Sequence, residues 1–197
     1  MVTWNGTTGG LSADGRTLVL GHGSGARFGS ESRFLVLDTR RLRSRALVTL
    51  PGVFSFDALS ADARTLFLIE HVSRRDNSRY RVRAYDLANR RLLERAIVDK
   101  REGTSVMRGR PVARASTAGG RWAYTLYAGG HHPFVHALDT VRRQAVCIDL
   151  PWDGKQDALW QTRLALGSDE RRLVLRRQGD GRALLTIDTR SFRVLRR

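Results

Sequence analysis

The sequence LSADGRTLVL at residues 11–20 recurs along the chain and decides the fold. It returns almost unchanged as LSADARTLFL at residues 59–68, and in weaker form as STAGGRWAY at 116–124 and GSDERRLVL at 167–175. Each copy is a turn of small and polar residues followed by a short run rich in apolar residues. This pattern is typical of a tight hairpin that leads into a β-strand.

A second pattern, a strand that ends in aspartate and a turn, alternates with the first. It reads FLVLDT at residues 34–39, VRAYDL at 82–87, VHALDT at 135–140 and LLTIDT at 184–189. The aspartates at 38, 86, 139 and 188 are 48, 53 and 49 residues apart, and the arginines at 16, 64, 121 and 171 are 48, 57 and 50 apart. Two patterns with one period near 50 residues indicate four structural repeats. The aspartates are expected to form turns.

Each repeat contains four strand-length segments, and helical periodicity is absent. We expect strands at 8–12, 17–21, 33–38 and 45–50 in the first repeat, and at 54–59, 65–69, 80–85 and 95–98 in the second. Four antiparallel strands in 40–50 residues make a propeller blade. The sequence therefore predicts an all-β, β-propeller-like array of about four blades, at approximately 7–52, 53–104, 105–156 and 157–197.

The SADGRTL turn and the Leu-Asp-Thr ending resemble the YVTN-type β-propeller repeats of bacterial surface and secreted proteins. LVLG at 18–21 and LFLI at 66–69 take the place of the tetrapeptide that names that family. The resemblance covers essentially the whole chain. It implies a rigid disc of roughly six to eight blades and a secreted or envelope-attached parent protein. Four repeats with abrupt ends favour a fragment of such a disc, a small ring or a homodimer that closes the propeller.

Charge is the outstanding feature of the composition. Lys and Arg total 35 against 19 Asp and Glu, which gives a net charge of +16. Because the arginines are spread along the chain, we interpret them mainly as surface residues, and a charge-driven polyanion binder is the alternative. Rows of stacking aromatic residues and a reading helix are absent, which argues against nucleic acid.

Other sequence features exclude several classes of protein. The single cysteine, Cys147, rules out a disulfide framework and a cysteine zinc site. No apolar run approaches the roughly 20 residues of a transmembrane helix, and the N-terminal sequence does not have the pattern of a signal peptide.

Histidines gather at the expected connections between the second and third strands of three blades. They are His22, His71, His131 and His132. In a propeller these connections lie on one face, and imidazole is a common metal ligand. The sequence therefore offers a candidate metal site, with solvated loop histidines as the alternative.

Two connections between blades are long, charged and rich in candidate ligand-binding residues. Residues 99–110 contribute Arg101, Arg108 and Arg110, and residues 151–157 contribute Trp152 and Lys155. Together they would form a cationic, aromatic-edged mouth for an acidic or glycan ligand or a protein partner. A solvated loop with a Trp packed between blades is the alternative.

No motif for nucleophilic catalysis or phosphate binding is present. We therefore expect a non-enzymatic binding or scaffold module without a cofactor, which binds its ligand on the loop face. A propeller enzyme with a metal or cofactor site on the same face is the alternative.

Overall fold

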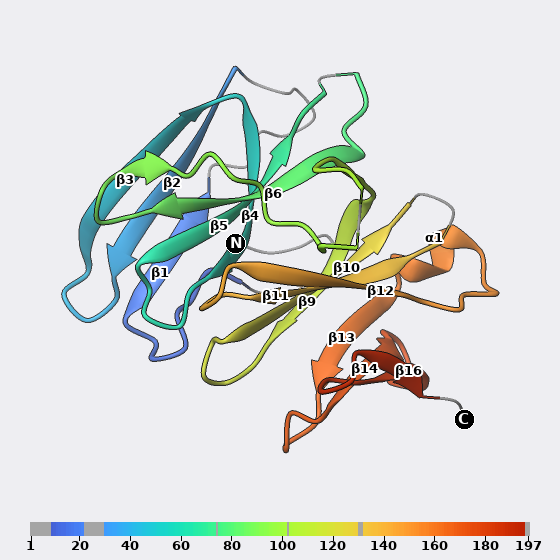
Figure 1. Ribbon diagram of the computed structural model, residues 1–197. Coiled ribbons are helices and arrows are strands. Elements are labelled where there is room, and N and C mark those ends of the chain that lie inside the picture. Colours follow the sequence, from blue (N-terminus) through green and yellow to red (C-terminus); the bar gives the residue numbers. More distant parts are fainter. Residues whose placement is uncertain (1–8, 22–29, 74, 102, 130–131, 196–197) are drawn as a thin grey trace.

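Four antiparallel sheets follow one another in chain order in the computed structural model, which describes residues 9–21, 30–73, 75–101, 103–129 and 132–195 (Figure 1). We number the sheets as blades 1 to 4. Blade 1 contains β1 (Thr17–Gly21), β2 (Glu31–Asp38) and β3 (Arg43–Pro51). Blade 2 contains β4 (Val53–Leu59), β5 (Thr65–His71), β6 (Arg79–Asp86), β7 (Arg91–Leu92) and β8 (Met107–Arg108).

The last two blades are regular four-stranded meanders. Blade 3 contains β9 (Arg110–Ser116), β10 (Trp122–Ala128), β11 (Phe134–Asp139) and β12 (Gln144–Asp149). Blade 4 contains β13 (Thr162–Leu166), β14 (Arg172–Arg177), β15 (Ala183–Asp188) and β16 (Arg193–Leu195). The predicted all-β array of antiparallel blades is confirmed.

The two repeated sequence patterns meet in each blade through the same hydrogen bond. In blade 1 the amide of Thr39, next to the periodic aspartate, donates to the carbonyl of Arg16. Blades 2, 3 and 4 repeat this bond at the equivalent positions. Asp38 itself accepts hydrogen bonds from the amides of Arg40 and Arg41, and the other three periodic aspartates do the same in their turns. The predicted role of these aspartates as turn formers is confirmed.

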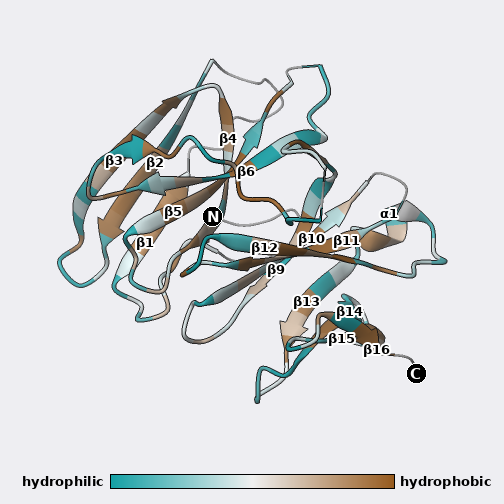
Figure 2. Ribbon diagram, in the orientation of Figure 1, coloured by the Kyte–Doolittle hydropathy of each residue, from teal (hydrophilic) through white to brown (hydrophobic). Residues whose placement is uncertain are grey.

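Apolar side chains pack between consecutive blades rather than within one central core. Three clusters of buried residues join blades 1 and 2, blades 2 and 3, and blades 3 and 4. Figure 2 shows hydrophobic segments on the strands, interrupted by hydrophilic ones, and mainly hydrophilic colours in the turns. The first strands β4, β9 and β13 form one edge of their sheets, and β9 and β13 contact each other.

The strand predictions fail at two places. The first strand of blade 1 is reduced to one bridge between Leu11 and Leu18 within the described residues. In blade 2 the predicted outer strand at 95–98 is broken, because only Ile97 bridges to β6 while β7 and β8 pair with other parts of β6. Residues 107–108 lie within the predicted third blade, at 105–156, but pair with β6 of blade 2.

One short helix, α1 (Gln156–Leu159), lies between blades 3 and 4. Within the described residues, no helix has the length and hydrophobicity to span a membrane.

Candidate functional site

A buried carboxylate, Asp57, marks the site. It lies in β4, where the pairing with β5 moves from Phe56 directly to Ala58, so that Asp57 is the extra residue of a β-bulge. Bulges redirect side chains. The Asp57 side chain is 1% exposed and contacts blade 3 instead of its own sheet.

Two residues of blade 3 hold this carboxylate. Thr125 on β10 donates its hydroxyl to Asp57 Oδ1 at 2.8 Å. Arg114 on β9 places its Nε 3.6 Å from the same oxygen, and its side chain is 17% exposed. The ion pair therefore joins the inner strands of two blades, with the guanidinium on its more accessible side.

A pocket of about 500 Å³ opens beside this pair, between the first strands of blades 1, 2 and 3. Its wall includes Asp57, Arg114 and Thr125, and also the apolar side chains of Leu18 and Phe56. Because residues from three blades line it, we call it the axial pocket.

The axial pocket lies where the turns of the first repeated pattern converge. Gly120, with φ of +70°, packs so closely that a Cβ on it would lie 3.2 Å from both the Ala13 Cβ and the Ala61 Cα. The close approach favours glycine there, because Ala63 and Glu170 adopt the same left-handed conformation at the equivalent positions of blades 2 and 4. The connections predicted to bind ligand leave the opposite ends of these strands, so the pocket and the predicted loop face are at opposite ends.

A row of buried and half-buried polar residues continues from the ion pair across blade 3. Arg114, Thr125, His136 and Cys147 are direct neighbours on β9, β10, β11 and β12. His136 is fully buried, and among the described residues neither of its ring nitrogens has a hydrogen-bond partner. Burial lowers the pKa of His136, although Asp57 and Asp99 act in the opposite direction. His136 is therefore neutral at pH 7.

Asp99 of the blade 2 to blade 3 connection binds the outer end of this row. Its carboxylate accepts the Cys147 amide at 2.8 Å and the Arg101 Nε at 3.0 Å. Burial alone would raise the pKa of Asp99, but the hydrogen bonds from Arg101 and Cys147 outweigh burial and lower it to about 2. Asp99 thus connects the two blades at their outer edge.

The arginines of the predicted ligand mouth lie apart from the axial pocket. Arg101 also donates to the Cys147 carbonyl at 3.0 Å, so it lies against the outermost strand of blade 3. Arg108 is exposed on β8, and Arg110 is exposed at the start of β9. The structure assigns Arg101 a contact between blades.

The aromatic part of the predicted mouth is partly packed into the protein. Trp152 is half-buried against the cluster between blades 3 and 4, and its Nε1 donates to the Lys155 carbonyl at 3.3 Å. Lys155 is exposed just before α1.

Two of the four candidate metal-binding histidines, His22 and His131, lie outside the described residues. His71 donates from Nδ1 to the Asn77 carbonyl at 3.0 Å, and its Nε2 is 3.3 Å from the Ser55 hydroxyl. Burial lowers the pKa of His71. His132 is exposed. In the part of the chain that the structure describes, no three His, Cys, Asp or Glu side chains form a group that could hold a metal ion.

Sequence reasoning missed the axial residues. Asp57 lies within an expected strand and is not among the predicted site residues, although a charged residue in the apolar run VFSFDAL is a signal for one. Arg114 could not be separated by sequence from the many surface arginines.

No protein-family model and no curated protein matches the sequence. Hydrazine synthase of Kuenenia stuttgartiensis is similar in structure, with a TM-score of 0.60 and 20% sequence identity over 94% of this chain and 46% of that chain. TolB from Acinetobacter baumannii gives a TM-score of 0.49 and 14% identity over 84% of this chain and 37% of that chain. The chain thus spans less than half the length of both proteins. The array of four blades and the similarity to hydrazine synthase establish that the chain has a β-propeller-type repeat fold.

Proposed function

We propose that the protein is a non-enzymatic binding module whose ligand occupies the axial pocket. The observation that carries this proposal is the Asp57–Arg114 ion pair in the wall of a pocket of about 500 Å³. Largely apolar pockets of this size with a few placed polar groups are typical ligand sites.

The chemistry of the pair favours an uncharged polar ligand. Asp57 and Arg114 neutralise each other, so a fully charged ligand would have to compete with one of them. A peptide carbonyl can accept from the guanidinium of Arg114, the more accessible member of the pair, while Leu18 and Phe56 provide apolar contacts. A polypeptide loop of a partner protein has this combination of groups.

Binding is favoured over proton transfer by the surroundings of Asp57. One carboxylate oxygen already accepts from Thr125 and lies close to Arg114. A carboxylate held in this way positions the groups that bind it. A general base, by contrast, must lie within hydrogen-bond distance of the substrate proton that it removes.

Selection of a displayed peptide library on the wild-type protein tests this proposal. Ser116 is exposed and lines the pocket, so Ser116→Trp should obstruct it without disturbing the fold. Selected peptides should bind Ser116→Trp at least about tenfold more weakly, a loss of about 1.4 kcal/mol.

Arg163→Trp on β13 is the matched control, because Arg163 is also exposed on a first strand but does not line the pocket. This variant should bind the peptides as the wild type does. Failure to enrich any peptide, or equal binding by both variants, would contradict the proposal.

The other functional expectations from the sequence stay predictions. They are a loop-face ligand site at Arg101, Arg108, Arg110, Trp152 and Lys155, a metal site at the four histidines, and polyanion binding. Membership of the YVTN-type family is likewise a proposal, supported by the repeated turn and the Asp-Thr ending.

A further inference from the structure

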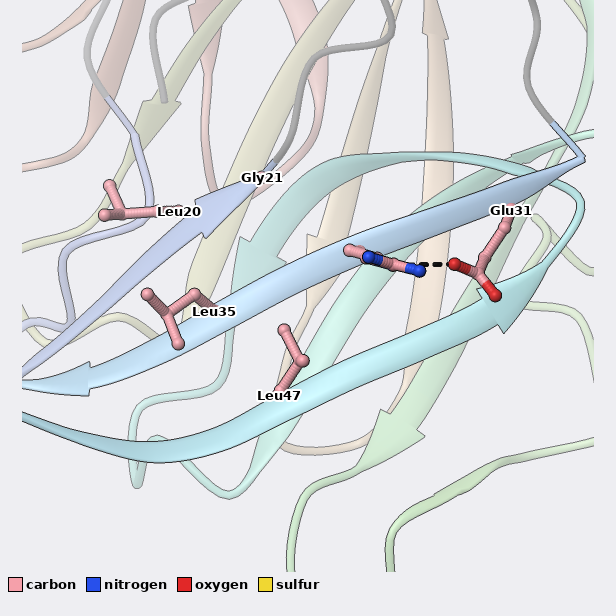
Figure 3. Close-up of a pocket in the computed structure, with 6 residues that line it drawn as sticks. Leu20, Gly21, Glu31, Leu35 and Leu47 are labelled. Atoms are coloured by element: carbon pink, nitrogen blue, oxygen red, sulfur yellow. Dashed lines mark hydrogen bonds and ion pairs between the residues drawn. The ribbon is translucent and has the colours of Figure 1, made fainter.

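The outer edges of blades 1 and 3 are built alike but are covered differently. β3 is the outermost strand of blade 1, and β12 is the outermost strand of blade 3. Figure 3 shows β3 along the margin of its sheet, with the Leu47 side chain next to that of Leu35 on β2. An outermost strand has backbone N–H and C=O groups that no strand of its own sheet pairs. The cover over these groups therefore decides whether the edge can bind another chain.

One hydrogen bond identifies the residues of β3 whose backbone groups point outward. The Gly52 amide donates to the Ser30 carbonyl at 2.7 Å, and these two residues continue the register of β3 and β2. Hydrogen-bonded pairs alternate along an antiparallel ladder, so every second residue counted back from Gly52 bonds to β2. The residues between them, Leu47 and Thr49, direct their N–H and C=O groups away from the sheet.

Cys147 on β12 occupies the position of Leu47. The Leu150 amide donates to the Pro133 carbonyl at 3.0 Å, so by the same alternation the backbone groups of Cys147 point outward. Leu47 pairs with Leu35, and Cys147 pairs with His136. Both partners precede the periodic aspartate of their blade by three residues. The two edges can therefore be compared residue by residue.

At Cys147 a segment of the chain itself covers the edge. Asp99 forms a parallel bridge with Ala145, and its carboxylate accepts the Cys147 amide at 2.8 Å. Arg101 donates from Nη2 to the Cys147 carbonyl at 3.0 Å. Residues 99–101 thus lie beside β12 as a short added strand. A carboxylate takes the place that a backbone carbonyl has in an ordinary sheet.

At Leu47 the equivalent groups are open. Among the described residues, none forms a hydrogen bond with the outward N–H and C=O groups of Leu47 and Thr49. Both side chains are exposed. β3 has nine residues, whereas the outer strands β7 and β16 have two and three. Blade 1 therefore offers a long open edge of the kind that blade 3 fills with its own chain.

The surroundings of this edge are positively charged. Four exposed arginines lie at the start of β3 and in the turn before it, at Arg40, Arg41, Arg43 and Arg45. Residues 39–56 contain no Asp or Glu. The carboxylate of Asp38, just before them, already accepts two turn amides. A segment that carries carboxylates is therefore favoured over a neutral or basic one.

We propose that the outer edge of β3 binds an extended acidic segment of a partner protein by strand addition. The segment hydrogen-bonds the outward backbone groups of Leu47 and Thr49, and its carboxylates lie next to the arginines at the start of β3. An apolar residue of the segment packs on the Leu47 side chain. Addition of a strand to an exposed sheet edge is a general mode of peptide recognition. The proposal goes beyond the axial pocket and does not depend on it.

Fluorescence polarisation with a labelled peptide of alternating valine and aspartate tests the proposal on the full chain. We expect saturable binding in about 50 mM NaCl that weakens in about 300 mM NaCl. The same peptide with asparagine in place of aspartate should bind at least about tenfold more weakly. Absence of binding by the aspartate peptide, or equal binding of the two peptides, would overturn the proposal.

A proline at position 47 tests the backbone pairing. Leu47→Pro removes an N–H that points away from β2, so the sheet should keep its own hydrogen bonds. Leu47→Ala is the matched control, because it loses the side chain but keeps the N–H. Leu47→Pro should bind the aspartate peptide at least about tenfold more weakly than Leu47→Ala. Thermal unfolding should show that both variants are folded. Equal binding by the two variants would rule out strand addition.

Charge reversal tests the place of binding. Arg43 pairs with Asp38 in blade 1 as Arg91 pairs with Asp86 in blade 2, and both arginines are exposed. Arg43→Glu should weaken binding of the aspartate peptide at least about fivefold at low salt, whereas Arg91→Glu should bind it as the wild type does. Equal losses in the two variants would assign the binding to net charge instead of the β3 edge and overturn the proposal.

Discussion

The boundary between blades 2 and 3 differs chemically from the boundary between blades 3 and 4. The residue four positions after the shared arginine is Thr125 in blade 3 and Leu175 in blade 4. Thr125 donates to the buried Asp57 of the preceding blade, whereas Leu175 lies in an aliphatic cluster with side chains of blade 3. Equivalent positions thus make a directional polar contact at one boundary and a non-directional apolar contact at the other.

This difference separates two tasks that blade packing performs. Apolar burial stabilises an interface in proportion to area and tolerates small sliding movements. A hydrogen bond to a buried carboxylate requires one geometry and costs free energy when either partner is lost. The boundary between blades 2 and 3 therefore fixes the position of Asp57 and Arg114 beside the axial pocket. The boundary between blades 3 and 4 mainly contributes stability.

The largest effect should come from the apolar boundary. Leu175→Ala removes a fully buried side chain and should lower the free energy of unfolding by about 3 kcal/mol. Leu20→Ala changes the equivalent, partly exposed residue of blade 1 and should cost less than about 1 kcal/mol. Urea unfolding of both variants measures the difference. Equal losses would contradict the distinction between the buried and exposed positions.

The next effect should come from the polar boundary. Asp57→Ala leaves Thr125 without its acceptor and Arg114 without its counter-charge, and should cost about 2 kcal/mol. Asp57→Asn keeps an acceptor for Thr125 and should lose about half as much. The same unfolding experiment measures both changes. If Asp57→Ala were as stable as the wild type, the polar contact would not fix this boundary.

Replacement of His136 should increase stability. His136→Leu removes a buried imidazole that has no hydrogen-bond partner among the described residues, so the free energy of unfolding should rise by about 1 kcal/mol. Its neighbour Thr125 offers the contrast, because Thr125→Val loses a real hydrogen bond and should destabilise by about 1 kcal/mol. Opposite signs of the two changes, measured by thermal unfolding, would confirm the comparison. A loss of stability in His136→Leu would assign the imidazole a hydrogen-bonding role.

Acid should weaken the folded protein in part through His136. Burial lowers the pKa of His136 in the folded protein, so the unfolded chain binds more protons as the pH falls below the ordinary histidine value of about 6.5. Stability is therefore fully present above that pH and decreases below it. His136→Leu should show a shallower decrease between about pH 7 and pH 5, with the remaining slope partly due to His71. Identical pH profiles would show that His136 does not titrate with unfolding.

The repeated turns were predictable because they depend on nearby residues. Asp38 and its three equivalents accept hydrogen bonds from amides only two and three residues away, so their sequence pattern already contains both partners. The alternation of apolar residues likewise predicted most strands within a few residues of their ends. The broken outer strand of blade 2 was not predictable, because the pairing of β8 with β6 joins residues far apart in the chain.

The candidate site depended more on tertiary structure than the turns and strands did. The sequence indicated the loops and their arginines and histidines, but the structure ties Arg101 to Asp99 and Cys147 at the outer edge of blade 3. The bulge at Asp57 is a local feature. Its side chain has a hydrogen-bond donor and a counter-charge only because blade 3 supplies Thr125 and Arg114.

The sequence by itself determined the period, the turns, the strands and therefore the blade, since these follow from φ/ψ preferences and hydrogen bonds within about 50 residues. Only the tertiary structure decided which equivalent side chains are buried. Leu20 and Leu68 occupy the same place in their repeats, and their exposures of 39% and 0% differ because another blade of the chain covers only Leu68. The neighbouring blade determines whether a residue of the repeat is buried. The repeated motif alone does not specify whether a blade packs against it.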